Sequence, residues 1–364
     1  MPDYQLLENA RFHLDDPAQF GFSPLDEAPD SSCVHAQFLT RHVEVSNALF
    51  PELSDTIRRA SKRLLGPNRI HAFISADETM NAACVPGPEG APLIWLSSGL
   101  IKGVNSKELP FIIGHEIGHW YYRHYLYPEI EPHAGPRFVA RQQLSRAAEI
   151  SCDRTGLLAC GDLDVALRAI LKTASGLTDE YISPRVSEYI SQARSLKLKS
   201  INQGEVFATH PPLVIRARAL LWFSMSREYA AIRGDSAGAH DLAVVNRRVE
   251  KDLGSVLGEG FRKKQVEEIH DALLWMTLYE LIEDGKLSKE DQQVIHQEFG
   301  KAVLEKVRAF VGGKTMDQVR LEIRDKAEDA HRLISAYPRQ LVQQHIANTN
   351  LAAEHTLRFL NRFN

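Results

Sequence analysis

Two histidines and a glutamate form the pattern HExxH within the segment FIIGHEIGHWYYRHY, residues 111–125. On a helix His115 and His119 lie one turn apart, so both imidazoles can reach one ion. Glu116 lies beside that face, where its carboxylate can take a proton from a water at the open position of the metal. The spacing predicts a metal centre with two nitrogen ligands and a general base.

The residues around this pattern favour a helix. Ser106 is expected to act as its N-cap, and Pro110 is tolerated in a first helical turn. No glycine–proline break interrupts the segment before Pro128. With 15 histidines among 364 residues, the pattern also arises by chance in roughly a few per cent of chains, so it needs support from elsewhere in the sequence.

A second helix is predicted over residues 137–161, RFVARQQLSRAAEISCDRTGLLACG, with Gly161 as its end. A zinc held by two histidines needs a third protein ligand, and Glu149 is the candidate. Asp153 lies one turn further along, where it can accept the second ring N–H of a ligand histidine and fix its tautomer. An acidic pair on a helix is otherwise typical of a solvated face. Small and apolar residues flank both acids here, which indicates burial, and a buried carboxylate needs a partner.

Four motifs together resemble a known family: MNAACVPGPEGAPLIWLSSGLI at residues 80–101, HEIGHWYYRH, SRAAEISCDRTGL, and ATHPPLVIR at residues 208–216. They are similar in kind and order to the core of the HtpX and CAAX-prenyl-protease type of zinc metalloendopeptidase, a branch of the gluzincins in peptidase family forty-eight. The best-known members are embedded in membranes. In this sequence the uncharged run from Gly90 to Ile101 is too short to cross a bilayer, so no transmembrane segment is expected.

The resemblance implies a zinc metalloendopeptidase with one Zn²⁺ per chain, which hydrolyses peptide bonds of peptide or protein substrates by metal-activated water. It implies these roles: zinc ligands His115, His119 and Glu149; general base Glu116; orientation of a ligand histidine by Asp153; oxyanion stabilisation by His210; and a place in the substrate or support network for Arg216. A histidine before proline is otherwise typical of a turn, so the role of His210 depends on the family pattern alone.

A small sheet is predicted from RIHAFIS, which alternates apolar residues, and from the apolar run PLIWLSS. The edge of such a sheet can pair with an extended peptide through main-chain hydrogen bonds. Asn81 and Ala82 are therefore the predicted substrate strand, and the resemblance also places Asn81 on the strand that lines the cleft. A plain structural strand is an equally good interpretation of these residues.

The predicted fold class is α+β and mostly helical, a gluzincin-like zinc peptidase core with a small β-sheet followed by a helical domain. The expected domains are an N-terminal arm over residues 1–45, a zinc metallopeptidase domain over residues 46–235 and a helical C-terminal domain over residues 240–364. The first 30 residues contain seven acids, one arginine and four prolines, which is typical of a solvated arm.

Composition places the chain among ordinary globular proteins, with 44% hydrophobic and 25% charged residues. A net charge of -4 offers no basic face, so no nucleic-acid partner is expected. The N-terminus lacks the basic region and apolar core of a signal peptide, and the four cysteines show no CxxC spacing. These features predict a cytoplasmic protein.

Two other functions remain open from the residues. One is a zinc-stabilised interaction or regulatory protein with a closed or repurposed cleft, in which the C-terminal helices bind a partner. The other is a zinc hydrolase that acts on something other than a peptide. Glu116 speaks against the first, because a purely structural site needs ligands but no base.

Overall fold

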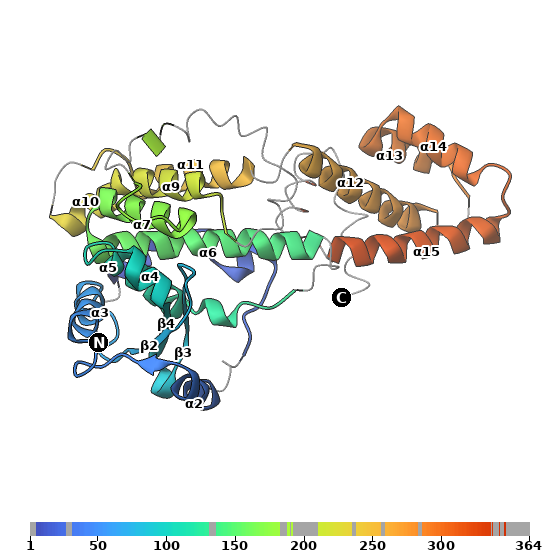
Figure 1. Cartoon of the computed structure of the whole chain (residues 1–364). Coiled ribbons are helices and arrows are strands. Elements are labelled where there is room, and N and C mark those ends of the chain that lie inside the picture. Colours follow the sequence, from blue (N-terminus) through green and yellow to red (C-terminus); the bar gives the residue numbers. More distant parts are fainter. Residues whose placement is uncertain are drawn as a thin grey trace. The chain divides into compact units, whose positions relative to one another are not determined.

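Helices make up most of this computed structural model, and one four-stranded sheet accompanies them (Figure 1). The structure describes residues 5–26, 31–130, 136–182, 188, 189, 191, 210–234, 238–255, 259–282, 286–335, 337, 342 and 346. Contacts divide the chain into two units. The first comprises Met1–Pro17, Phe22–Glu129 and Gln142–Gly258, and the second comprises Ala18–Gly21, Ile130–Arg141 and Glu259–Asn364. The expectation of a mostly helical α+β fold is confirmed.

The first unit contains the sheet and most of the helices. In chain order its elements are α1 (Gln5–Ala10), α2 (Ser31–Arg41), β1 (Val43–Glu44), α3 (Pro51–Arg63), β2 (His71–Ser75), β3 (Ala82–Pro86), the 3-10 turn η2 (Pro88–Gly90), β4 (Pro92–Ser97), α4 (Ser98–Gly103), α5 (Leu109–Tyr121), the 3-10 turn η3 (His124–Leu126), most of α6 (Pro136–Cys160), α7 (Leu163–Ser175), α9 (Leu213–Ser224), α10 (Arg227–Arg233) and α11 (Leu242–Ser255).

The sheet has the strand order β1-β2-β4-β3. Strands β2 and β4 run parallel, whereas β1 and β3 pair antiparallel with their neighbours. The two runs predicted as strands are β2 and β4, so the small sheet is confirmed. Strand β3, which carries Ala82, lies at one edge, and Asn81 directly precedes it.

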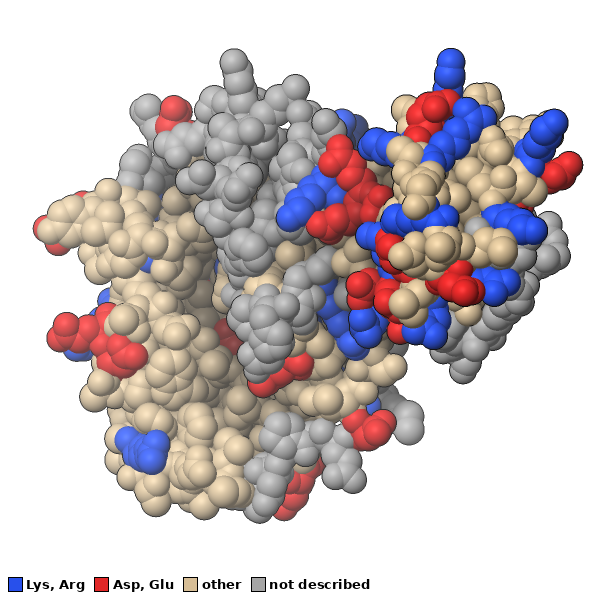
Figure 2. Space-filling model, turned by 90° about the vertical axis from the view of Figure 1, so that its right-hand side faces the viewer, with Lys and Arg blue, Asp and Glu red and all other residues tan. Residues whose placement is uncertain are grey.

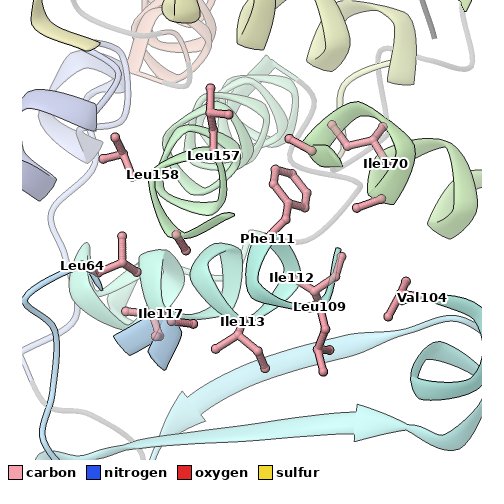
Figure 3. Packing of buried hydrophobic residues seen from close by; sticks show 14 of the residues in the cluster. Leu64, Val104, Leu109, Phe111, Ile112, Ile113, Ile117, Leu157, Leu158 and Ile170 are labelled. Atoms are coloured by element: carbon pink, nitrogen blue, oxygen red, sulfur yellow. The ribbon is translucent and has the colours of Figure 1, made fainter. Parts of the chain in front are cut away.

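Helix α5, which carries the HExxH pattern, lies between the sheet and helices α6 and α7 (Figure 3). Leu109 and Ile113 point toward the strands, while Phe111 points the other way, toward Leu157 and Ile170. All five side chains are buried. A helix that is apolar on both sides fits between two layers, and this position fixes the orientation of its polar residues.

The start of α5 differs from the prediction that Ser106 is its N-cap. Helix α5 begins at Leu109, and the side-chain oxygen of Asn105 accepts the N–H groups of Lys107 and Glu108. Glu108 in turn accepts the N–H of Asn105 and, at 2.7 Å, a hydrogen bond from Nζ of the fully buried Lys172 on α7. The buried carboxylate and ammonium offset each other's desolvation and tie α5 to α7.

The expectation of a solvated N-terminal arm is wrong for its first part. Leu7, Ala10 and Phe12 have no exposed surface. The N–H of Phe12 donates to Oγ of Ser151 on α6, and its ring lies 5.2 Å from the guanidinium carbon of the buried Arg154. The acid-rich composition is therefore misleading, because the few apolar residues of the arm pack on α6 and hold it there.

Helix α11 belongs to the first unit, although it was expected in the C-terminal domain. Its buried residues Val245, Val249 and Leu253 share a hydrophobic cluster with Ile215 and Ala219 of α9. The division of contacts follows Gly258, beyond the expected domain boundary near residue 240. Residues 235–237 of the expected junction lie outside the described part of the chain.

Among the described residues, the second unit contains most of the 3-10 turn η1 (Pro17–Phe20), the start of α6, and the helices α12 (Glu259–Leu281), α13 (Lys289–Phe299), α14 (Lys301–Val311) and α15 (Met316–Ser335). It has a hydrophobic core of its own. Ser288 caps α13 with a reciprocal capping box, as its position before the helix predicts. On the face in Figure 2, described Lys and Arg side chains lie intermixed with Asp and Glu side chains. Among the described residues, no helix combines the length and apolar character that a membrane crossing requires.

The docked arm generates a stability prediction. Phe12→Ala should lower the free energy of unfolding by about 3 to 5 kcal/mol, because it removes a fully buried ring and leaves a cavity. Urea denaturation followed by circular dichroism measures the loss. Leu25→Ala is the control in the same region, since Leu25 is 45% exposed and its truncation should cost little. Equal stability of the two variants would contradict the packing of Phe12.

Candidate metal centre

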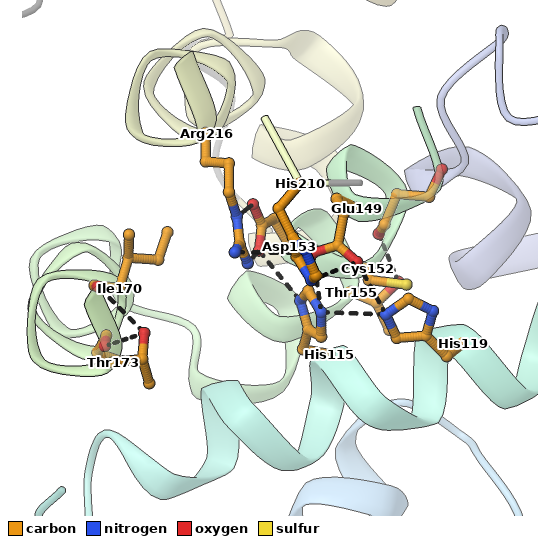
Figure 4. A network of polar contacts seen from close by, with 12 residues as sticks. His115, His119, Glu149, Cys152, Asp153, Thr155, Ile170, Thr173, His210 and Arg216 are labelled. Atoms are coloured by element: carbon orange, nitrogen blue, oxygen red, sulfur yellow. Dashed lines mark hydrogen bonds and ion pairs between the residues drawn. The ribbon is translucent and has the colours of Figure 1, made fainter. Parts of the chain in front are cut away.

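The predicted ligand residues meet at the contact of α5 with α6 (Figure 4). The Nε2 atoms of His115 and His119 lie 3.2 Å apart. Oε2 of Glu149 lies 3.6 Å from Nε2 of His115, and the other oxygen, Oε1, lies 3.4 Å from Nε2 of His119. Tetrahedral zinc with bonds of about 2.0 to 2.2 Å separates neighbouring donor atoms by roughly 3.3 to 3.6 Å. The three side chains are therefore spaced as ligands of one such ion.

Glycines let the two helices approach closely enough for this arrangement. Gly114 and Gly118 each precede one of the histidines on α5. A methyl group on Gly114 would lie 2.4 Å from Cβ of Ala159, and one on Gly118 would lie 3.1 Å from Cα of Cys152. Any larger residue at Gly114 would push the helices apart and move Glu149 away from the histidines.

Asp153 orients the first ligand histidine. Its Oδ1 lies 3.0 Å from Nδ1 of His115, and because a carboxylate only accepts, Nδ1 carries the proton and Nε2 keeps its lone pair for a metal. Arg216 of α9 donates to both oxygens of Asp153, at 2.8 Å from Nε and 2.5 Å from Nη2. Burial alone would raise the pKa of Asp153, but the charge of Arg216 holds it below its usual value.

The second ligand histidine has an equivalent chain of partners that the sequence did not reveal. Nδ1 of His119 lies 2.8 Å from Nδ1 of His124, and Nε2 of His124 lies 3.0 Å from Oδ2 of Asp15. The hydroxyl of Tyr127 donates to the other oxygen of Asp15 at 2.6 Å. Asp15 accepts the proton on Nε2 of His124, so Nδ1 of the neutral His124 ring carries no proton and accepts the N–H of Nδ1 of His119. Nε2 of His119 then keeps its lone pair.

The pKa directions of His124, Asp15 and Tyr127 agree with the protons assigned to these three residues. Burial lowers the pKa of His124, which favours the neutral imidazole. Burial by itself would raise the pKa of Asp15, but His124 and Tyr127 hold it below its usual value. Burial followed by the charge of Asp15 raises the pKa of Tyr127, so the phenol keeps the proton that it donates.

Local backbone geometry explains how His124 reaches His119. Residues five apart on a continuous helix do not face each other. Helix α5 ends at Tyr121, and Arg123 adopts a left-handed conformation with φ 58°, which turns the chain back before η3. No periodic pattern in the sequence predicts this turn. Asp15 stands in the acid-rich arm, and only its apolar neighbours Phe12 and Leu14 distinguish it from a solvated acid.

A cation fits between Glu149 and the histidines. Oε2 of Glu149 is buried and has no hydrogen-bond partner among the described residues. Burial would raise the pKa of Glu149, but His119, His115 and Arg216 hold it well below its usual value. Burial would likewise lower the pKa of His119, but Glu149 raises it to about 8. The site thus favours positive charge next to an ionised carboxylate with a vacant acceptor.

Cys152 is the other side chain near the two ligand nitrogens. Its Sγ can approach within 4.8 Å of ligand atoms of both His115 and His119. Burial and the nearby carboxylates raise the pKa of this thiol well above its usual value, which opposes the thiolate that a metal requires. Glu149, whose pKa is held well below its usual value, is therefore the better candidate for the third ligand.

Glu116 and strand β3 lie beside this centre. Glu116 is 6% exposed. Burial, followed by the negative charge of Glu116, raises the pKa of Cys84 on β3 well above its usual value, so the two side chains are close enough to interact. Two hydrogen bonds fix the main chain of Asn81 to Ser97 at the end of β4. The N–H of Asn81 donates to Oγ of Ser97, and the carbonyl of Asn81 accepts the N–H of Ser97.

His210 lies on the solvent side of the site. Its side chain is 64% exposed, and its Nε2 lies 3.5 Å from Oε1 of Glu149. Arg216, in contrast, is largely buried, and its Nη1 lies 3.6 Å from Oε2 of Glu149. Ala208 and Thr209, which precede His210 in the family-like motif, lie outside the described residues.

A cavity of about 700 Å³ in the first unit lies elsewhere. It is lined by α3, by the loop from Leu65 to Ile70, and by Val45 and Ala72 near the start of the sheet. None of the candidate metal ligands lines it. Its position therefore gives no information on the substrate of the metal centre.

Comparisons with known proteins find similarity to metallopeptidases. Residues 47–136 match the model of peptidase family M48, a range that includes HExxH but ends before Glu149. The Arabidopsis thaliana protein named "Plastoglobule-localized metallopeptidase 48, chloroplastic" is 29% identical over 164 residues, which is 39% of this chain and 48% of that protein. The chain therefore spans about half the length of this curated relative. No solved structure matches it. Both matches confirm the resemblance to peptidase family M48 that the motifs indicate.

Proposed function

We propose that the chain is a zinc-dependent metalloendopeptidase whose zinc is held by His115, His119 and Glu149. The observation that carries this proposal is the spacing of the three donor groups, whose closest ligand atoms lie 3.2 to 3.6 Å apart. One of the two Glu149 oxygens, Oε2, is also buried without a hydrogen-bond partner among the described residues. The family match supports the metallopeptidase class, and an HExxH pattern with a carboxylate as the third ligand suits Zn²⁺.

The chain's own groups supply the proton transfers and the orientation. A bound zinc would polarise the scissile carbonyl and lower the pKa of water in the site. Glu116 would take the proton from the attacking water and deliver it to the leaving amine. Asp153 and the His124–Asp15 chain would hold the two imidazoles with Nε2 toward the ion.

Strand β3 would bind the substrate main chain. The carbonyl of Asn81 accepts the N–H of Ser97, and the N–H of Gly87 donates to the carbonyl of Ala91. In an antiparallel pair every second residue directs its main-chain N–H and C=O toward the partner strand, so residues 83 and 85 also direct theirs toward β4. Main-chain groups of Ala82 and Cys84 then face the open edge. The side chain of Asn81 already accepts the N–H of Ala82 at 2.9 Å, so the carbonyl of Ala82 and both groups of Cys84 remain for an extended peptide.

His210 and Arg216 would have different tasks. His210, whose ring is exposed beside Glu149, would donate to an oxyanion that forms on the substrate. Arg216 donates two hydrogen bonds to the buried Asp153, which favours a role in supporting the ligand side chains over contact with the substrate.

The cellular location stays a prediction. The composition predicts a cytoplasmic chain, whereas the Arabidopsis relative is named as plastoglobule-localized and chloroplastic. That description belongs to the relative.

Zinc affinity tests the proposed ligands and their partners. Glu149→Ala should abolish tight binding, because a bond to the ion is lost. Asp153→Ala and Asp15→Asn should weaken binding by roughly 10 to 100-fold, because each leaves a ligand imidazole without its orienting chain. Competition with a chelator of known affinity measures these changes. Asp317→Asn is the control, since that carboxylate is 95% exposed. Equal affinity of wild type and Glu149→Ala would remove Glu149 from the ligands.

Loss of the proposed base should separate metal binding from turnover. Glu116→Gln should keep about one zinc per chain but lower peptide hydrolysis by about 100-fold or more, because an amide cannot accept the proton. Metal analysis and cleavage of casein or a peptide library by the zinc-loaded protein measure both. Glu78→Gln, at an exposed position, is the control. Wild-type turnover by Glu116→Gln would refute the mechanism, and a zinc-loaded but inactive wild type would favour an interaction protein instead.

The proposed oxyanion donor gives a kinetic signature. His210→Ala should lower kcat by about 100-fold or more with little change in KM, because such a donor acts mainly on the transition state. Steady-state kinetics on a cleaved peptide separate the two constants. A change confined to KM would make His210 a substrate-binding residue.

A further inference from the structure

We propose that His35, Glu44 and His71 bind a second divalent transition-metal ion, separate from the candidate metal centre. His35 is on α2, Glu44 on β1 and His71 at the start of β2. This inference goes beyond the proposed peptidase function and does not depend on it.

The register of the strands brings the three side chains together. Glu44 pairs directly with Phe73 on β2, and His71 is two residues before Phe73. Residues two apart in a strand, and residues directly opposite each other, point to the same face of the sheet. Glu44 and His71 are therefore diagonal neighbours on one face. The ring of His35 lies on that same face, 5.8 Å from the ring of Phe73 and 4.8 Å from that of His71.

The spacing of donor atoms is that of a metal site. One ligand atom from each of the three residues lies within 4.8 Å of the others. Nδ1 of His71 is 3.5 Å from Oε1 of Glu44, which is between the 3.4 and 3.6 Å that separate Glu149 oxygens from His119 and His115. The rings of His35 and His71 have centroids 4.8 Å apart and cross at 67°, compared with 5.0 Å and 65° for His115 and His119.

Two ring nitrogens at this place lack any partner in the described part of the chain. Nε2 of His35 and Nε2 of His71 are both buried without a hydrogen bond, and His71 as a whole is only 6% exposed. Buried polar atoms in folded proteins nearly always have a partner, so an ion at this place would satisfy Nε2 of His35. One ion can bond only one nitrogen of each ring, so from His71 it would take either Nδ1, which is already next to Glu44, or Nε2, with Glu44 turned toward it. The Glu44 side chain is 44% exposed, so it can rotate toward the ion and leaves a path for entry from solvent.

The donor set selects the class of ion. Two imidazoles and one carboxylate suit Zn²⁺, Co²⁺ or Cu²⁺, whereas Ca²⁺ and Mg²⁺ prefer oxygen ligands throughout. An ion held by all three residues would tie α2 to β1 and β2, which makes the site a structural clamp for α2.

The test uses the full chain with the candidate metal centre removed by His115→Ala and His119→Ala. We expect this double variant to bind about one Zn²⁺ in equilibrium dialysis with metal analysis, and to show visible absorption when loaded with Co²⁺. Adding His35→Ala or His71→Ala should abolish that binding. Adding Glu44→Gln should weaken it by about 10-fold or more, because the charged donor is lost.

His42→Ala is the matched control. His42 is a neighbouring histidine whose buried Nδ1 also lacks a partner among the described residues, but it is not part of the cluster, so its removal should leave zinc affinity unchanged. No zinc bound by the double variant, or binding that survives both His35→Ala and His71→Ala, would overturn the proposal. If His71→Ala fails to fold by circular dichroism, Glu44→Gln decides, because its half-exposed side chain can change without loss of packing. Failure of the peptidase proposal would appear instead as wild-type zinc binding that does not depend on His115 and His119.

Discussion

Burial of negative charge is the constraint on which the site depends. Asp15, Glu149 and Asp153 are each at most 5% exposed, and an ionised carboxylate in a protein interior needs cationic or hydrogen-bonding partners. Asp153 has Arg216 and His115, and Asp15 has His124 and Tyr127. Of these three carboxylates, Glu149 alone keeps an oxygen without a hydrogen-bond partner among the described residues. The helices therefore bury a negative charge at Glu149 that a bound cation would neutralise.

The parts of the site that could be predicted are those that repeat along one helix. His115 and His119 on α5, and Glu149 and Asp153 on α6, are each four residues apart, and helix geometry fixes which face such pairs share. Apolar flanks indicated that both faces are buried. The structure brings both pairs together, and the helices themselves are confirmed.

The parts that could not be predicted depend on contacts between distant segments or on a break in periodicity. Asp15 stands more than a hundred residues before His124, in a stretch whose composition resembles a solvated arm. His124 reaches His119 only because Arg123 leaves the helical conformation. At the start of α5, the side chain of Asn105, and not that of Ser106, accepts the N–H of Glu108. The carboxylate of Glu108 in turn accepts a hydrogen bond from Lys172 on a later helix. The assignment of α11 to the first unit likewise depends on which neighbours its apolar face meets.

The glycines of α5 bear on which ions the centre can accept. Because Gly114 and Gly118 set the approach of α5 to α6, the donor atoms are held by packed backbones rather than by flexible loops. A rigid frame cannot expand to suit a larger ion. Separations of 3.2 to 3.6 Å match bonds near 2.1 Å, whereas Ca²⁺ needs bonds of about 2.3 to 2.6 Å and more ligands. If the proposed centre holds an ion, helix packing would limit the size of that ion, and residues that never touch the ion would contribute to metal selectivity.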